Sequence, residues 1–291
     1  MMFRQGDRVK RFLSMFGFAW LAWAASPDLD RANKLYNITE FQQSLEVLQA
    51  VPNKDAAVYE LIGRDYYGQG EFRKATGALE QAAILAPGDS GVYLWLGRSY
   101  GRRAETSSMI TAPGLANKAR RFFERATQLN PANLEAQSDL FEYYLEAPGF
   151  LGGGLDKAAD TALQIARISP AEGHSAQAKL AEKRKEFGSA EAQLRRALEI
   201  APQQIGRLID LARLLAKRGR YQEADLSLTK AEQIAPNSPK LMFAKADLYI
   251  KGKRNLDIAR ELLKRYLSSA LTPEDPPRAD AEKLLKQVQG S

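Results

Sequence analysis

The chain has no cysteine and a single histidine, His174, among its 291 residues. These absences exclude disulfides, thiolate nucleophiles and every zinc site built from cysteine and histidine. His174 lies in the stretch SPAEGHSAQ, just inside an expected helix start, where polar residues are common. We expect it to be an ordinary surface or packing residue. No metal, cofactor or catalytic imidazole is therefore predicted.

A long hydrophobic run is also missing. The longest apolar stretch, FLSMFGFAWLAWAA, has about 14 residues, fewer than the roughly 20 that a membrane-spanning helix needs. Basic residues precede this stretch, and Ala22-Trp23-Ala24 offers small residues at the two positions that a signal peptidase reads. The pattern is typical of a cleaved secretory signal over residues 1–25 and predicts an exported, periplasmic protein of the bacterial cell envelope. The alternative is an uncleaved anchor, which would be the chain's one contact with a membrane.

Charge of one sign is not concentrated anywhere. The 42 basic and 35 acidic residues give a net charge of +7, and the basic residues are spread along the chain. This distribution favours acidic partners only weakly. With 45% hydrophobic residues, the chain is long and apolar enough to bury a substantial core.

Apolar and small residues recur with helical spacing in residues 58–87, VYELIGRDYYGQGEFRKATGALEQAAILAP. The positions are Tyr59, Ile62, Gly63, Tyr66, Phe72, Ala75, Leu79 and Ala82. Each half of this set follows the spacing of one helix face, and Gly70 stands where the chain must turn between the halves. The stretch therefore predicts two antiparallel helices closed by Pro87.

The same order returns in residues 207–236, and prolines close successive units. The second set is Leu208, Leu211, Ala212, Leu215, Gly219, Tyr221, Ala224, Leu228 and Ala231, and the prolines are Pro87, Pro131, Pro170, Pro202 and Pro236. The pattern resembles the tetratricopeptide repeat, a helix-turn-helix unit of 34 residues. The resemblance covers roughly residues 30–268. It implies an all-α, right-handed superhelix of about seven repeats over residues 26–268, with a C-terminal capping helix and tail over residues 269–291.

Two intervals between closing prolines exceed the 34-residue period, by 10 and by 5 residues. The extra residues are AETSSMITAPGLAN and APGFLGGGLD, which we place at the turn between the two helices of their repeats. Turns of neighbouring repeats lie side by side, so we expect these insertions to touch and to expose Met109, Ile110, Phe150 and Leu151. This edge is a candidate for contact with a partner or a second copy. The alternative is that Phe150 and Leu151 fold back over the helix ends beneath them.

The glycine-rich part of the second insertion, GFLGGGLDK, raises the question of a phosphate-binding loop. Such a loop needs a strand before it, a lysine after its last glycine and a hydroxyl for the metal. Here a helix precedes the glycines, Lys157 follows Asp156, and Ala158 stands in the place of the hydroxyl. We therefore expect no nucleotide site. Asp156 is expected to be the N-cap of the next helix.

The resemblance implies that the first helix of each repeat lines a concave face. Its ninth positions here are Lys34, Arg64, Arg98, Glu142, Lys179, Arg213 and Asp247, and neighbouring positions add Tyr67, Leu94, Arg102, Lys183 and Lys217. Five of the seven ninth positions are basic, which favours an extended peptide with acidic groups. The candidate peptide-binding residues are Arg64, Tyr67, Arg98, Arg102, Lys179, Arg213 and Lys217. The alternative is that these side chains are simply solvated.

The carboxylate clamp of chaperone-binding members of this family is not transferred, because only Arg98 fits it. Nucleic acid is not expected, since Tyr67 is the single aromatic residue in the stripe and an exported protein rarely meets nucleic acid. Catalysis is not expected either, since paired carboxylates are common on helix surfaces. The sequence predicts a non-catalytic scaffold that binds a protein or peptide partner. The alternative is a periplasmic small-ligand or transporter-accessory protein.

Overall fold

The computed structural model describes residues 27–289, so the expected signal over residues 1–25 lies outside the described residues. Within this range the secondary structure is helical throughout, with no strand. The helices are α1 (Pro27–Asn37), α2 (Phe41–Gln49), α3 (Ala56–Gly68), α4 (Phe72–Leu85), α5 (Ser90–Glu105), α6 (Ala112–Leu129), α7 (Leu134–Glu146), α8 (Leu155–Ile168), α9 (Pro170–Lys183), α10 (Phe187–Ile200), α11 (Ile205–Lys217), α12 (Tyr221–Ile234), α13 (Pro239–Lys251), α14 (Leu256–Ser268) and α15 (Arg278–Gln289), with a short 3₁₀ turn, η1 (Gly149–Leu151), before α8.

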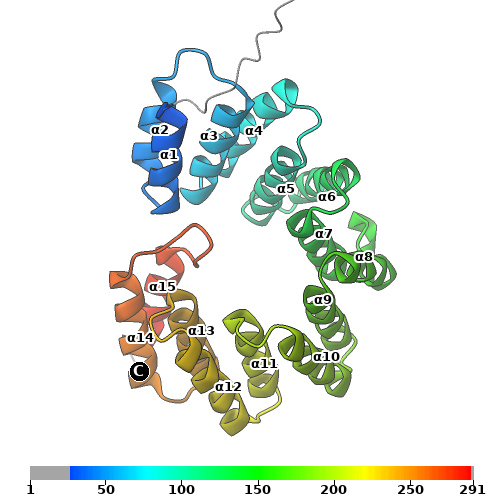
Figure 1. The fold of residues 1–291 in the computed structure, drawn as a ribbon, viewed down its shortest axis with the longest axis vertical. Helices are drawn as coiled ribbons and strands as arrows, with labels where there is room; N and C mark the ends of the chain where they lie inside the picture. The colour runs from blue at the N-terminus through cyan, green and yellow to red at the C-terminus, as the bar shows by residue number, and fades with distance from the viewer. Residues whose placement is uncertain (1–26, 290–291) are drawn as a thin grey trace, which may run out of the picture.

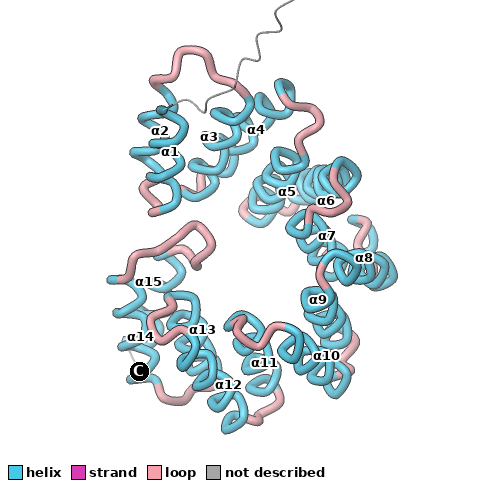
Figure 2. The backbone as a smooth tube through the Cα atoms, in the orientation of Figure 1, coloured by secondary structure: helices cyan, strands magenta, loops and turns pink. Residues whose placement is uncertain are grey.

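Helices α1 to α14 form seven antiparallel pairs, which confirms the predicted all-α solenoid of about seven repeats. Each pair packs on the next, and the stack curves into an almost complete ring (Figure 1). The odd-numbered helices lie toward the inside of the ring and the even-numbered helices toward the outside, and short loops join them (Figure 2). The ring brings the loop before α15 close to the first pair.

Two kinds of local chemistry start the helices. Most first helices begin at a capping side chain: Asp55, Asp89, Asn133, Ser169 and Ser238 each accept a hydrogen bond from a backbone N–H of the first turn. Each such cap contributes about 1 kcal/mol. Five of the seven second helices begin instead after a tight turn with a left-handed residue, Thr39, Gly70, Lys185, Gly219 or Lys253. The turn sets the antiparallel pairing without a capping side chain.

Glycine allows the paired helices to approach closely at two repeats. A Cβ added to Gly63 would lie 2.5 Å from Cγ of Leu79, and a Cβ added to Gly97 would lie 2.4 Å from the ring of Phe123. Alanines on the second helices, such as Ala75, are fully buried in the same interfaces. The small residues of the repeat pattern therefore set the helix spacing, as the sequence indicated.

The first insertion differs from its expected form. It does not make a long turn, because α5 continues to Glu105 and α6 begins at Ala112, so that most of the extra residues lengthen these two helices. Only residues 106–111 remain as the connection. Ala104 and Glu105, at the start of the inserted stretch, are good helix formers, and Glu105 forms an ion pair with Arg102 on α5.

The glycine stretch closes the C-terminus of α7. The N–H of Gly154 donates to the carbonyl of Tyr144 at 2.8 Å, and a Cβ on Gly153 would lie 1.8 Å from the carbonyl oxygen of Ala147. Gly152 has φ of 86°. Only glycine permits this fold-back. The expectation that Asp156 is the N-cap was wrong: α8 begins at Leu155 and Asp156 lies within its first turn, where its charge favours the helix dipole.

Helix α15 covers the end of the stack. Ala281 and Val288 are buried against the last pair, and Leu271 of the preceding loop is buried with them. Arg260 of α14 donates to the carbonyl of Val288 at 2.8 Å. These contacts shield the apolar face of α14 from water, as an end repeat requires. In residues 27–289 no helix combines the length and apolarity needed to cross a membrane.

Candidate binding surface on the concave face

The predicted groove residues separate into two groups on the inner helices. Arg64, Tyr67 and Arg98 come together on α3 and α5, while Lys179 and Lys217 lie on α9 and α11 around a shallow pocket. Leu94, expected in the groove, is buried in the core instead. The concave face is therefore two chemically different surfaces rather than one basic stripe.

Arg98 is held by carboxylates of the following repeat. Its Nε lies 2.5 Å from Oδ2 of Asp139 and its Nη2 lies 3.0 Å from Oε2 of Glu135, both on α7. Burial holds the pKa of Asp139 above its ordinary value, and the charge and hydrogen bond of Arg98 offset part of this rise. Because two carboxylates occupy its donors, Arg98 joins α5 to α7 and is a poor candidate for holding a ligand.

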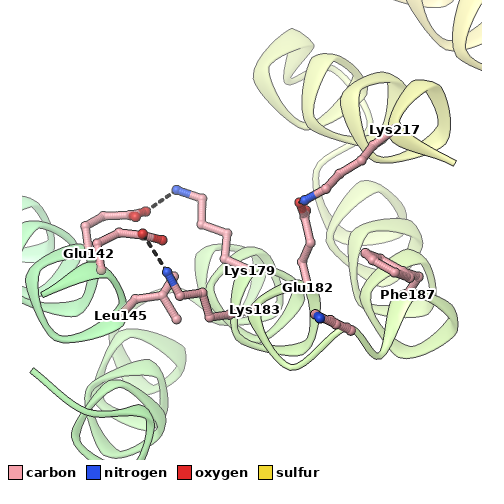
Figure 3. Close-up of a pocket in the computed structure, with 9 residues that line it drawn as sticks. Glu142, Leu145, Lys179, Glu182, Lys183, Phe187 and Lys217 are labelled. Carbon is pink, nitrogen blue, oxygen red and sulfur yellow. Dashed lines mark hydrogen bonds and ion pairs between the residues drawn. The ribbon is translucent and has the colours of Figure 1, made fainter. Parts of the chain in front are cut away.

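The pocket on α7, α9 and α11 is lined by alternating charges and has a volume of about 460 Å³ (Figure 3). Its lining residues are Glu142, Leu145, Glu146, Lys179, Glu182, Lys183, Lys185, Phe187 and Lys217. We call these residues the lysine pocket.

In the lysine pocket, lysines bind glutamates of the preceding repeat. Lys179 pairs with Glu142. Lys183 and Glu146 are 2.6 Å apart, as are Lys217 and Glu182. The positive charge of Lys179, Lys183 and Lys217 is thus largely matched by glutamates.

The two remaining candidates pair within their own helices. Arg213 lies 3.2 Å from Asp210, and Arg102 lies 2.5 Å from Glu105 while its guanidinium also lies over the ring of Phe72. Both arginine side chains are about half exposed. Exposed pairs of this kind are weak, so a ligand carboxylate could replace either partner at little cost.

A cluster of aromatic rings and arginines lines α1, α3 and α5. The guanidinium carbon of Arg64 lies 4.5 Å from the ring centroid of Tyr36 and 5.0 Å from that of Trp95. Trp95 also meets Arg98 at 4.8 Å and the ring of Tyr67 edge-on at 5.3 Å. We call Tyr36, Arg64, Tyr67, Trp95 and Arg98 the aromatic–arginine cluster.

The sequence analysis missed Tyr36 and Trp95. Trp95 stands three residues before Arg98 on the same helix, a spacing that places both on one face, and this signal could have found it. Tyr36 lies in another repeat, 28 residues from Arg64, and only the stacking of the first two pairs brings them together. The statement that Tyr67 is the single aromatic residue on this face was therefore wrong.

Electrostatics within the cluster reflect its partial burial. Burial holds the pKa of Tyr67 above its ordinary value, and the positive charges of Arg102 and Arg98 offset part of this rise. Burial also raises the pKa of Glu60, the nearest carboxylate to Arg64 at 3.8 Å, and Arg64 lowers it. An arginine close to several half-buried rings is suited to an anionic group with an apolar neighbour.

The predicted edge is exposed at three of its four residues. Met109 and Ile110 are 93% and 92% exposed, and Phe150 is 79% exposed. Leu151 was expected to be exposed but is half-buried. Its carbonyl accepts a hydrogen bond from the Tyr143 hydroxyl at 3.0 Å. Turn η1 packs on the lengthened α6. Phe150 does not fold back over the helix ends.

His174 lies on α9, where its Nδ1 is 2.6 Å from Oε1 of Gln193 on α10. It packs between the two helices of one repeat, as a polar residue at that place was expected to do. No group of three histidine, aspartate or glutamate side chains that could hold a metal ion occurs in residues 27–289.

No protein-family model matches this chain, and no curated protein matches its sequence. Solved structures match it by fold. A thermophilic TPR protein from Thermus thermophilus is 21% identical with a TM-score of 0.52, over 68% of this chain and 97% of that one. A tetratricopeptide repeat protein from Parabacteroides merdae is 14% identical with a TM-score of 0.60, over 90% and 97% of the two chains.

A third match is the Cut9–Hcn1 hetero-tetramer of the APC/C, at 14% identity and a TM-score of 0.53. The match covers 91% of this chain and 49% of that chain, so this protein spans about half its length. Identities this low establish the fold and nothing more. This chain therefore has the helical-solenoid fold of tetratricopeptide-repeat proteins.

Proposed function

We propose that this protein is a non-catalytic scaffold of the bacterial cell envelope that holds an acidic or extended peptide segment of a protein partner on its concave face. One observation carries the proposal: the inner helices present arginine and aromatic side chains on α3 and α5 and lysine side chains on α9 and α11, as two surfaces of the concave face. Peptide recognition by a helical groove needs such periodic anchors. No cofactor, metal or nucleic acid enters this proposal.

Capture of partners from cross-linked envelope, followed by mass spectrometry, tests this function. The bait is the tagged full chain beside an Arg64→Gln, Lys179→Glu, Lys217→Glu variant, which changes both concave surfaces while leaving the structural residue Arg98 in place. An Arg196→Glu, Lys230→Glu variant on the outer helices α10 and α12 is the matched control. A partner kept by the control and lost by the concave variant supports the proposal. Equal capture by all three baits contradicts it.

Export is part of the proposal and depends on residues 1–25. Basic residues, a short apolar run and a small-x-small sequence support it. N-terminal sequencing of the protein from fractionated cells tests it, with a mature chain that starts near residue 26 in the periplasmic fraction as the expected result. A cytoplasmic chain that retains Met1 would contradict it.

The edge offers a second contact surface. Met109 and Ile110 are almost fully exposed on the 106–111 connection, and Phe150 stands on the neighbouring turn. We infer that a partner or a second copy covers them, since exposed apolar side chains without a core of their own are costly in water. A Met109→Ser, Ile110→Ser, Phe150→Ser variant should keep its melting temperature and lose one captured partner or its self-association. Unchanged capture and unchanged mass in solution would reject this role.

A small-ligand or transporter-accessory protein is the alternative function, and the lysine pocket is the observation in its favour. Its volume of about 460 Å³ lies in the range of small-molecule sites. A ligand in the pocket would raise the melting temperature of the full chain in a fractionated metabolite pool. A Lys179→Gln, Lys217→Gln variant should lose that rise; no rise in the wild type rejects the alternative.

A further inference from the structure

Arg64 has the loosest carboxylate pairing of the six candidate peptide-binding cations. Its nearest carboxylate oxygen, on Glu60, is 3.8 Å from Nη1, and its Nε is buried with no hydrogen-bond partner. The other five candidate peptide-binding cations, Arg98, Arg102, Lys179, Arg213 and Lys217, each have a carboxylate oxygen within 3.2 Å. An incoming carboxylate therefore displaces less existing pairing at Arg64 than elsewhere on this face.

The rings of Tyr36 and Trp95 hold the guanidinium of Arg64 in place, and the Tyr36 hydroxyl accepts a hydrogen bond from one of its five donors. The guanidinium lies over Tyr36 and Trp95, and stacking engages the face of the group while its N–H bonds lie in the plane. Two of these in-plane donors match the two oxygens of a carboxylate. Trp95 also contacts Arg98, but Asp139 and Glu135 already hold that guanidinium. Arg64 is thus the stacked arginine of the cluster with capacity for a new anion.

An acidic loop of the same chain lies beside this cluster. Residues 272–277, TPEDPP, form the connection between α14 and α15, and the ring brings this connection to the first helix pair (Figure 1). Burial raises the pKa of Tyr36; Arg64 lowers it, and the negative charges of Asp65 and Glu274 raise it. Glu274 is exposed, yet its charge reaches the ring on which Arg64 rests.

We propose that Arg64, stacked on Tyr36 and Trp95, is the carboxylate-binding subsite of the concave face for an acidic peptide, and that the loop carrying Glu274 competes for it. This inference rests on the proposed function, since it names where on the concave face the peptide is held. The lysine pocket then contributes less, because each of its paired lysines must leave a glutamate before it can bind a ligand. Neutralising Glu274 should tighten binding.

The chain carries its own reporter of this subsite. Its three tryptophans are Trp20, Trp23 and Trp95, so a full chain with Trp20→Phe and Trp23→Phe keeps Trp95 alone. The probe is a synthetic dodecapeptide of alternating glutamate and serine, with a glutamine–serine peptide as its uncharged control. Trp95 emission reports occupancy, and the anisotropy of a fluorescein-labelled probe gives the dissociation constant at low salt.

The glutamate peptide should change Trp95 emission, and the glutamine peptide should not. Arg64→Gln and Arg64→Lys should each weaken binding about tenfold or more, because lysine keeps the charge but not the planar pair of donors. Lys179→Gln with Lys217→Gln should stay within about twofold of the parent. Glu274→Gln should tighten binding about threefold, while the matched control Glu282→Gln on α15 leaves it unchanged. Circular dichroism melting confirms that each variant is folded.

Four results would overturn the inference: binding that Arg64→Lys leaves intact, binding lost in the lysine-pocket variant instead, equal binding of the glutamine peptide, or no binding to the parent chain up to about 1 mM. Equal affinity of the Glu274→Gln and Glu282→Gln variants would show that the loop carrying Glu274 does not compete for Arg64. Binding that depends on the lysine pocket would leave the scaffold proposal standing while this subsite fails. Arg64-dependent binding of the probe without any captured partner would support this subsite while the scaffold proposal fails.

Discussion

The Nε of Arg98 on α5 lies 2.5 Å from Oδ2 of Asp139 on α7, which joins the third helix pair to the fourth. About three quarters of each side chain is covered, so loss of one partner leaves the other largely desolvated. We expect Arg98→Leu to lower the free energy of unfolding by about 2 kcal/mol, less than for a fully buried pair. Urea denaturation measures this. A charge-reversal variant at Arg98 would therefore lower stability as well as change the charge of the concave face, so it could not test binding alone.

Arg213→Leu is the matched control for Arg98. Its arginine is about half exposed and pairs with Asp210 on its own helix, so the free energy of unfolding should change by no more than about 0.5 kcal/mol. The double variant Arg98→Leu, Asp139→Leu should recover part of the loss, because it removes the unpaired carboxylate. Equal effects of Arg98→Leu and Arg213→Leu would show that the inter-repeat pair is not structural.

Close packing of α5 on α6 requires glycine at position 97, and substitution of an exposed glycine, Gly77, provides the comparison. Gly97→Ala should lower the free energy of unfolding by about 1–3 kcal/mol, because its Cβ would lie 2.4 Å from the ring of Phe123. Gly77 lies on the exposed side of α4 with no atom within 4 Å of an added Cβ, so Gly77→Ala should raise the stability by about 0.5–1 kcal/mol. Thermal melting of both variants checks the opposite signs. A Gly97→Ala variant as stable as the wild type would contradict the close approach of α5 and α6.

Asp65 should make stability depend on pH. It is fully buried, its Oδ2 accepts a 2.7 Å hydrogen bond from Ser44, and burial raises its pKa to about 7. The folded chain therefore keeps a proton up to about pH 7 that the unfolded chain releases near pH 4. The stabilisation is complete below about pH 4 and is lost as the pH rises through 7, a change on the order of 4 kcal/mol.

The Asp65→Asn variant tests this by comparison. The difference in unfolding free energy between wild type and variant should move in favour of the variant from pH 5 to pH 8, because asparagine carries no charge at either pH. Taking a difference cancels the contributions of other carboxyls with raised pKa, such as Glu60 and Asp139. A difference that stays constant over this range would refute a buried, titrating Asp65.

The inter-helix turns offer a reciprocal pair of substitutions. Lys185 and Gly219 stand at corresponding turns with φ of 64° and 75°, a left-handed conformation that costs about 1 kcal/mol for a residue with a Cβ. Lys185→Gly should therefore raise stability by up to about 1 kcal/mol, and Gly219→Ala should lower it by about the same amount. Melting temperatures of the two variants should shift in opposite directions. Shifts of the same sign would show that turn conformation does not govern these positions.

Much of the fold could be predicted because its signals are local. Helical spacing, the turn glycines and the closing prolines each act within one repeat, and the structure has the seven helix pairs that they indicate. The first insertion was misplaced because its residues 104–105 and 112–117 lengthen α5 and α6, which a count of residues between prolines cannot detect. Asp156 was assigned as a cap because its type suits that position, whereas the fold-back at Gly153 starts the helix two residues earlier than such a cap would.

By itself, the sequence determined the class of this protein: a repeat that buries one apolar stripe per helix can only stack on copies of itself. It also indicated that the first helix of each repeat lies toward the inside of the ring (Figure 1). Only the tertiary structure decided what the residues of those helices can do, because their partners come from other repeats. Asp139 lies 41 residues beyond Arg98, and Glu182 lies 35 residues before Lys217. Stacking the repeats pairs Arg98, Lys179 and Lys217 with carboxylates. It also brings Tyr36 and Trp95 to Arg64, which has the loosest carboxylate pairing of the candidate peptide-binding cations.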